Sequence, residues 1–591
     1  MHHIFKRSSR WAGLGLFFML GGTVASAGAQ ESGSLVGTVR ADETGRLVAG
    51  AQISIVGTTL GTLTRANGTY LIVNVPAGPV TVRVQYIGYA MQQSTVTVRA
   101  GAPTQVDFTL STEAIGLDEI VVTGTAGQAR RREVGNSIGQ LSEATIEASP
   151  VRSPQDLLMG RVAGVSVLQN AGQPGAGGDI RLRGNNSISQ GNRPLVYVDG
   201  IRIYSDQPPA HPNARQTISP INDINPADIA RVEVVRGAAA TTLYGTEASG
   251  GVIQIFTKRG LSGAARWDAE MTVGFNNMGH VGPDSDPTGL WMNRCRGEGL
   301  ETSTGTIFED VSCPADGSWL RNGLVQRYSL SLRGGTESIN YYLSGNYNDE
   351  RGAIKMGGGS TTGGIRGNFG YKPTPSLEIT LNTNFTKSDI EWVPAGNNAD
   401  AFTASVMRGT SSKYVGAEGC TPGVICIDNA APLRDQDNYT RGDHFITGLT
   451  LSHTLGESIT NRLTVGYDYN NPEAAEIFYF GYQRYPEGQM GLNNWRRTLT
   501  SVDYVGTLAN AFGEKLTSSF SWGGQIFADE TRYTRAFTER FAGPGDPTLT
   551  GGSLSSILGD SKLRVVNAGF FFQELLGLND RLFATVGARV D

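Results

Sequence analysis

The feature of the sequence that most constrains its fold is the alternation of long and short connections between residues 265 and 591. The connected segments are strands of about ten residues or more, in which alternating apolar and polar side chains face opposite sides of a sheet. In one segment Leu377 and Ile379 alternate with Glu378 and Thr380. The long connections span 278–323, 350–361, 390–441, 472–497 and 540–560. The short turns span 334–339, 372–376, 456–460, 513–516 and 578–580.

A soluble β-sandwich would show the same period of two, but it has no reason to keep all its long loops at one end. Short turns at one end and long loops at the other are typical of outer-membrane barrels. The sequence therefore predicts a mainly β protein with a transmembrane antiparallel β-barrel over 265–591.

The number of strands in this region bears on the completeness of the barrel. We count about eleven, whereas single-chain bacterial barrels have an even number of strands. An unpaired strand edge is not tolerated inside lipid. We therefore expect the 591-residue sequence to be a fragment that holds about half of the barrel strands.

The first residues predict export. Lys6, Arg7 and Arg10 precede an apolar run that is too short to span a bilayer as a helix, and a small-x-small sequence ends at Ala29. This pattern indicates a secretory signal peptide over 1–29, cleaved after Ala29. An uncleaved anchor is the alternative.

Two further regions lie between the signal peptide and the predicted barrel. Residues 33–111 contain short alternating runs separated by turn residues, with a hairpin signal at Asn67-Gly68, and predict a small β-sandwich. Residues 127–260 mix strand patterns with a helix start at Ser153-Pro154-Gln155-Asp156, which predicts one α/β domain.

Composition excludes several classes of function. Glycine supplies 79 of 591 residues, roughly twice the usual share, which favours a β protein with many turns. A net charge of −5 without clustered basic residues argues against a nucleic-acid partner. We find no nucleophile–base set, metal cluster or phosphate-binding loop, and therefore expect no enzyme activity and no cofactor.

Four cysteines, Cys295, Cys313, Cys420 and Cys426, fall in the predicted long loops. In an exported protein they can form disulfides, and proximity in sequence favours the pairs Cys295–Cys313 and Cys420–Cys426. Zinc binding is the alternative, but the spacings differ from short paired knuckles and no histidine lies nearby.

The order of these regions resembles the TonB-dependent outer-membrane transporters, and most closely their SusC/RagA-type branch. The motifs that carry the resemblance are IRLRG (180–184), PLVYVDG (194–200) and the stretch from INDINPADIARVEVVRG to TKRG (221–260). Residues 33–111 look like a carboxypeptidase-regulatory-like domain with a transthyretin-like fold. The resemblance implies that 127–260 form a plug inside a barrel of about 22 strands.

The resemblance also assigns residues 117–125, LDEIVVTGT, as a TonB box. It implies that the segment faces the periplasm and pairs with the inner-membrane TonB protein as an added strand. We therefore expect this strand to have no partner in its own chain. A last strand of the preceding domain, or a plain linker, is the alternative. The core residues are Asp118, Glu119, Ile120, Val121, Val122 and Thr123.

The function that the resemblance implies is TonB-dependent import of a large nutrient, an oligosaccharide or a peptide, with a SusD-type surface lipoprotein as a further partner. TonB pulling on the box would rearrange the plug. A siderophore or cobalamin receptor of the same fold is the first alternative, and an outer-membrane adhesin or structural protein is the second.

Charged residues of the predicted plug are candidates for contacts with the barrel wall, because the interior of such a barrel is polar. Ordinary hydration of a wet interior is the alternative. These candidates are Arg181, Arg183, Asp199, Glu233, Arg236 and Glu247.

Overall fold

The computed structural model forms two compact units, Met1–Leu117 and Asp118–Asp591. No helix among the residues that the structure describes is long and apolar enough to cross a membrane. The described residues are 32–42, 46–58, 60–65, 67–86, 89–110, 120–122, 128–130, 138–148, 151–169, 171–185, 188, 191–206, 216–236, 238–278, 300–301, 307–310, 320–355, 357–394, 425–427, 436–482, 485–513 and 515–591.

The first unit is a β-sandwich. One sheet has the order β4-β1-β7, with β8 also pairing with β1, and the other has the order β3-β2-β5-β6. Inward side chains such as Leu35, Ile53, Val84 and Phe108 form one apolar core between the sheets. The strands are β1 (Ser32–Ala41), β2 (Gln52–Ile55), β3 (Gly61–Leu63), β4 (Thr69–Pro76), β5 (Gly78–Tyr86), β6 (Tyr89–Val98), β7 (Pro103–Gln105) and β8 (Phe108–Leu110).

The expectation of a hairpin at Asn67-Gly68 is wrong. The turn itself forms, because Gly68 adopts a positive φ of 67° and its N–H donates to the Arg65 carbonyl over 2.8 Å. However, the strands on either side, β3 and β4, belong to different sheets. The turn is therefore a corner of the sandwich, and its local chemistry could not reveal which sheet each strand joins.

The second unit contains a five-stranded mixed sheet, which we call the plug sheet. Its order is β11-β16-β17-β14-β15, with β14 parallel to β17. Its strands are β11 (Ile138–Leu141), β14 (Leu195–Val198), β15 (Ile201–Ile203), β16 (Ile229–Val235) and β17 (Val252–Thr257). A separate hairpin pairs β12 (Val165–Gln169) with β13 (Gly178–Leu182). The helices are α1 (Glu143–Glu147), α2 (Pro154–Leu158) and α3 (Ala238–Tyr244).

The expected helix start at Ser153 is confirmed, because the Ser153 hydroxyl accepts a hydrogen bond from the Asp156 N–H over 3.2 Å. The helix is shorter than its apolar pattern suggests and ends at Leu158. Gly160 and Gly164, with φ of 72° and 76°, turn the chain toward β12 instead.

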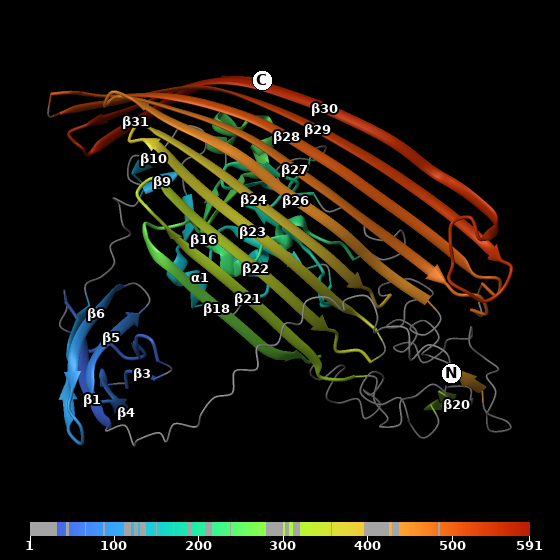
Figure 1. Cartoon of the computed structure of the whole chain (residues 1–591), viewed down its shortest axis with the longest axis horizontal. Coiled ribbons are helices and arrows are strands. Elements are labelled where there is room, and N and C mark those ends of the chain that lie inside the picture. The colour runs from blue at the N-terminus through green and yellow to red at the C-terminus, as the bar shows by residue number, and fades with distance from the viewer. Residues whose placement is uncertain are drawn as a thin grey trace. The chain divides into compact units, whose positions relative to one another are not determined.

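An antiparallel sheet of eleven strands curves around the plug sheet, and we call it the wall (Figure 1). This confirms the expected number of strands; the sheet does not close on itself. Its strands are β18 (Gly263–Asn276), β21 (Gly323–Gly335), β22 (Ile339–Arg351), β23 (Gly359–Thr374), β24 (Leu377–Glu391), β26 (Gln436–Leu455), β27 (Ile459–Phe478), β28 (Gln489–Phe512), β29 (Leu516–Phe541), β30 (Gly552–Leu578) and β31 (Leu582–Val590).

Two of the expected long loops are shorter than predicted. Strand β27 ends at Phe478 and β28 begins at Gln489. Strand β29 ends at Phe541 and β30 begins at Gly552. Polar residues such as Asn493 and Arg535 pair in register within these extensions. Polar composition alone does not end a strand, because backbone pairing can continue where both faces of the strand are polar.

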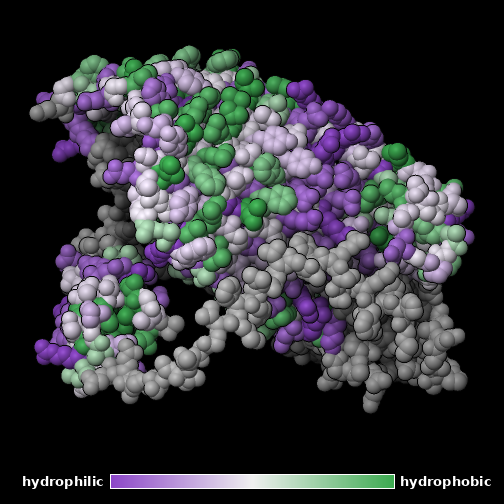
Figure 2. Space-filling model, viewed as in Figure 1, coloured by the Kyte–Doolittle hydropathy of each residue, from purple (hydrophilic) through white to green (hydrophobic). Residues whose placement is uncertain are grey.

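The two faces of the wall differ in chemistry. Trp267, Leu330, Ile365 and Phe369 point away from the plug sheet and are exposed. Figure 2 shows apolar residues gathered on this outer side of the wall. Inward positions carry buried polar side chains such as Asn382. An apolar outer face and a polar inner face are the arrangement that a lipid-facing barrel requires.

We predict that Tyr70→Phe destabilises the first unit. The Tyr70 hydroxyl, in the sandwich core, donates to the Val106 carbonyl over 2.7 Å. Its loss leaves a buried acceptor unpaired, which costs about 1–3 kcal/mol. Urea unfolding of the N-terminal unit measures the change. Val73→Ala, on the exposed side of the same strand, is the control, and equal effects of the two variants would contradict this account.

Candidate functional site

The candidate site is the seam where side chains of the plug domain meet the inner face of the wall. Its central group is Asp199, in the two-residue turn between β14 and β15. Asp199 and Gly200 have φ of 51° and 85°, which fits the Asp-Gly preference of a type I′ hairpin turn. The turn projects the Asp199 carboxylate toward the wall.

The Asp199 carboxylate joins plug and wall. Within the plug it accepts hydrogen bonds from the Thr257 N–H over 2.9 Å and from the Thr257 hydroxyl over 2.6 Å. From β23 of the wall, Arg366 Nη2 donates to it over 2.6 Å. Asn368, two residues along β23, donates to the Lys258 carbonyl over 3.1 Å. The Asp199 and Arg366 side chains are almost fully buried, so this is an ion pair shielded from solvent.

A second contact joins the plug to β22. The Tyr342 hydroxyl donates to Asp228 Oδ1 over 2.8 Å, and both residues are buried. Asp228 ends the short 3-10 helix η4 (Pro226–Asp228). Burial raises the pKa of the Asp228 carboxyl above its ordinary value, although Arg366 and Lys258 oppose this effect. The seam therefore contains a carboxyl group for which ionisation is unfavourable.

A histidine forms the third contact. His444 of β26 lies between Asp223 of the plug and Asp468 of β27, with each ring nitrogen 2.7 Å from a carboxylate oxygen. A doubly protonated imidazole satisfies both carboxylates by donating from each nitrogen. The second oxygen of Asp468 accepts from the Tyr204 N–H over 2.8 Å, just after β15. The histidine thus links one plug acid to one wall acid.

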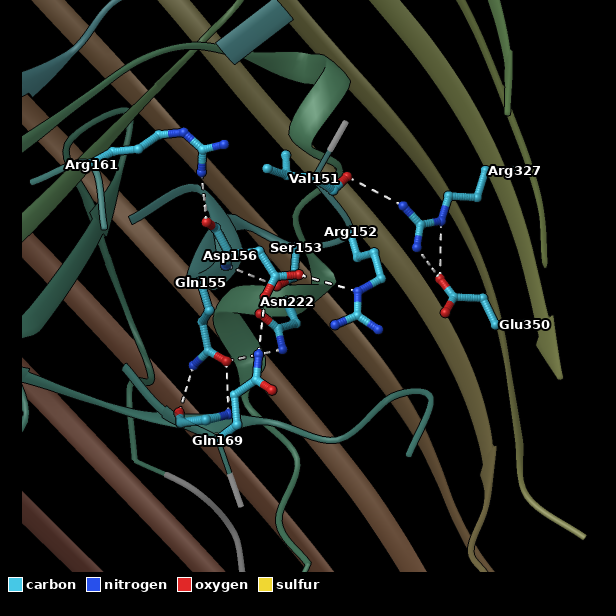
Figure 3. Close-up of polar contacts among 11 residues, drawn as sticks. Val151, Arg152, Ser153, Gln155, Asp156, Arg161, Gln169, Asn222, Arg327 and Glu350 are labelled. Carbon is cyan, nitrogen blue, oxygen red and sulfur yellow. Dashed lines mark hydrogen bonds and ion pairs between the residues drawn. The ribbon is translucent and has the colours of Figure 1, made fainter. Parts of the chain in front are cut away.

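A further polar group lies near the loop end of β22 and β23. Gln155 of α2 holds Gly178 by two hydrogen bonds of 2.7 and 2.8 Å and accepts a third from Asn222 (Figure 3). Arg327 of β21 donates to the Val151 carbonyl over 3.2 Å and pairs with Glu350 (Figure 3). A cavity of about 110 Å³ lies here between the plug and these strands. Amides, hydroxyls and paired charges dominate its lining.

The structure places two of the six candidate plug residues in contacts with wall side chains. These are Asp199, described above, and Glu247, which accepts from Asn567 of β30 over 2.6 Å and pairs with Arg202. The contacts of the other four described here lie within the plug. Arg181 pairs with Asp179, Glu233 accepts from Arg231, Arg236 donates to the Ala163 carbonyl, and the Arg183 N–H donates to the Gly164 carbonyl.

Sequence reasoning did not identify the wall partners Arg366, His444, Asp468 and Tyr342. A signal was available for three of them. Each stands at an inward position beside at least one outward-facing apolar or aromatic residue: Arg366 follows Ile365, His444 precedes Phe445, and Asp468 stands between Tyr467 and Tyr469. A charged residue in that position must meet either water or the plug.

The segment proposed as the TonB box is described only in part. Ile120–Val122 form β9, which pairs antiparallel with β10 (Gln128–Arg130). Asp118, Glu119 and Thr123 lie outside the described residues. The expectation that this strand has no partner in its own chain is wrong. Among the described strands β9 pairs with β10 only, so its second edge remains for another strand.

The predicted disulfides stay predictions. Cys426 lies in β25 (Ile425–Ile427), which pairs in parallel with β20 (Ile307–Asp310). Cys295, Cys313 and Cys420 lie outside the described residues. The pairing of β20 with β25 does bring two of the expected long loops together.

We predict that Arg366→Met destabilises the docking of the plug. It leaves the Asp199 carboxylate buried without its cation, which costs about 3–5 kcal/mol. The measurement is the free energy of unfolding in urea. Asp199→Asn combined with Arg366→Met should recover much of the loss. Arg333→Met, which breaks a more exposed pair with Asp268, is the control and should cost about 0–1 kcal/mol.

The raised pKa of Asp228 predicts a pH dependence of stability. The folded protein keeps this proton to a higher pH than the unfolded chain, whose aspartates have a pKa of about 3.9. Wild-type stability should therefore fall as pH rises from about 4 toward the folded pKa. Asp228→Asn keeps an acceptor for Tyr342 and should remove this part of the slope. Identical slopes of the urea midpoint against pH in the wild type and in Asp228→Asn would contradict the assignment of this pH dependence to Asp228.

Comparison with known proteins agrees with this architecture. The TonB-dependent Receptor Plug Domain model matches residues 130–252, and the CarboxypepD_reg-like domain model matches residues 35–122. The "TonB-dependent receptor SusC" of Bacteroides thetaiotaomicron is 30% identical, over 67% of this chain and 36% of its own length. The "TonB-dependent receptor P26" of Formosa agariphila is 28% identical, over 74% and 42%.

Solved structures agree at the level of fold. The RagAB peptide importer in its "open-open" state aligns with a TM-score of 0.62 and 18% identity, over 80% of this chain and 56% of that one. The ferric citrate transporter FecA aligns with a TM-score of 0.52 and 13% identity, over 80% and 58%. The chain spans less than half the length of the curated relatives it matches. With its plug, its N-terminal domain and these relatives, the chain belongs to the TonB-dependent receptors of the SusC/RagA type.

Proposed function

We propose that this receptor takes part in TonB-dependent import of a large nutrient, an oligosaccharide or a peptide. The observation that carries the proposal is the plug itself, held against the wall by polar contacts such as Asp199–Arg366. A plug seated on polar contacts can be released and seated again, because the groups that separate can be hydrated. The family consists of receptors and transporters, not enzymes.

The energy would come from TonB pairing with residues 118–123. Strand β9 has one edge occupied by β10 and lies just before the plug. Strand addition at an exposed edge takes its affinity from main-chain hydrogen bonds. A pull on β9 would be transmitted through β10 to residues 131–137 and then to β11, which pairs with β16 of the plug sheet. The pulling force would therefore act on the plug sheet before it acts on the strands of the wall.

The relatives support the cargo class and the partner. One is named a SusC receptor, and a neighbour in fold is described as a peptide importer within the RagAB assembly. A SusD-type lipoprotein is the proposed surface partner. Shorter matches to a rhizobactin receptor and a vitamin B12 transporter, over 30% and 28% of this chain, make a metal chelate the alternative cargo.

Deleting residues 118–123 from the full-length receptor should abolish energised uptake and leave surface binding intact. The probes are labelled maltoheptaose, a labelled peptide pool and a ferric siderophore, each given to cells with and without TonB. Val121→Pro should act like the deletion, because proline removes a backbone donor. Val121→Ala is the matched control. Uptake that survives the deletion would rule out the proposed coupling, and uptake of the siderophore alone would select the alternative cargo.

A further inference from the structure

A polar cavity of about 550 Å³ lies between the plug sheet and the inner face of the wall. It extends from the β14–β15 turn toward the ends of β24, β26, β27 and β28 that carry the short turns. The wall residues that line it form two rows across neighbouring strands. They are Thr380, Thr450, Thr464 and Asp503 in one row and Glu378, Ser452 and Arg462 in the next.

Two groups that line the cavity are buried without a hydrogen-bond partner among the described residues. Both carboxylate oxygens of Asp503 are unpaired, although only 8% of this residue is exposed. The hydroxyl of Tyr197, on β14, is also unpaired. Buried polar atoms are nearly always hydrogen-bonded in folded proteins. Water or a polar solute in the cavity can supply hydrogen bonds to these atoms.

The tip of the β14–β15 hairpin stands at the other end of this cavity, where Asp199 and Gly200 line it. Ile201 is 1% exposed and lies against Gly448 of β26 and Gly466 of β27, which are paired in register. A Cβ at Gly448 would lie 2.4 Å from Ile201 Cδ1, and one at Gly466 would lie 2.7 Å from Ile201 Cγ2. The apolar side chain thus fits only because both wall positions lack one.

The row with Thr450 and Thr464 begins two residues beyond these glycines, a rise of about 7 Å along the strands. One hydrophobic contact of the hairpin tip therefore stands next to a row of polar side chains that lines the cavity. The turn that carries it is held from behind by Asp199, through Thr257 and Arg366. The closure and its anchor belong to the same four residues, Val198–Ile201.

We propose that this cavity is a preformed part of the route by which polar cargo passes the plug, and that Ile201 seated on Gly448 and Gly466 closes it. The proposal rests on the proposed import function. Withdrawal of the hairpin tip would open the cavity at the end where Ile201 stands. Wall strands β26 and β27 would keep their pairing. The passage would then run between plug and wall rather than through the plug.

A disulfide between Ile201→Cys and Gly466→Cys tests this directly. The Cβ of Ile201 lies 3.3 Å from the ideal Cβ position at Gly466, close to the usual disulfide separation of about 3.5–4.5 Å. Ile201→Cys also removes the Cγ2 atom that would clash with the new side chain, and the Ser501 hydroxyl, 2.6 Å from the new Cβ, must turn to another rotamer. The full-length receptor is placed in a planar bilayer, with KCl as the conducted probe and urea to loosen the plug.

The oxidised double variant should stay closed at urea concentrations where its reduced form and the wild type conduct. The Ile201→Cys single variant, treated with the same oxidant, should conduct as the reduced double variant does, because it has no thiol at position 466 to pair with, and circular dichroism checks the fold. Conduction at the same urea concentration in oxidised and reduced forms would overturn the proposal. A wild type that unfolds without conducting first would also overturn it.

A second variant tests the passage rather than its closure. Thr464→Trp fills the cavity and should lower the KCl conductance of the urea-opened state. Val465→Trp, on the opposite face of the same strand and 41% exposed, should leave it unchanged. Equal conductance of the two variants would place the route elsewhere. Neither bilayer test contains TonB, so a negative result here leaves TonB-dependent import to be judged by the deletion of 118–123.

Discussion

The structure depends on how a charged plug is accommodated against a wall that faces lipid on its other side. Burying a single carboxylate such as Asp199 would be very unfavourable without a partner. The wall supplies one with Arg366 and orients it through the pairing of β23 with its neighbours. The same solution recurs at Tyr342 and at His444, so the seam is a set of matched polar groups rather than an extension of the apolar core.

This polar seam separates two requirements that would otherwise conflict. The plug sheet has its own apolar core, which includes Val196, Ile229 and Ile253, and the wall has its backbone ladder. Each can keep its internal structure while the contacts between them change. Ile446 and Ile201 are two of the places where apolar side chains pack across the seam, and Ile201 does so against the backbone of Gly448 and Gly466.

The sequence predicted the strands, their number and the order of the regions, because a period of two and the turn residues are local signals. It did not predict the pairing of β9 with β10, since three-residue strands carry too little pattern. It found Asp199 but not Arg366, because contacts across 167 positions depend on tertiary register. The sequence does not distinguish Gly448 and Gly466 from other strand glycines, because the reason for them is a contact with Ile201, which is distant in the sequence.

The central claim is that the plug can leave its seat while the wall stays folded. Single-molecule pulling on the segment before residue 138, with the full-length receptor held in a bilayer, tests this most directly. The account predicts that plug elements extend in steps and that no length corresponding to β18 or later strands is released. A single rupture in which wall strands unfold together with the plug would contradict it.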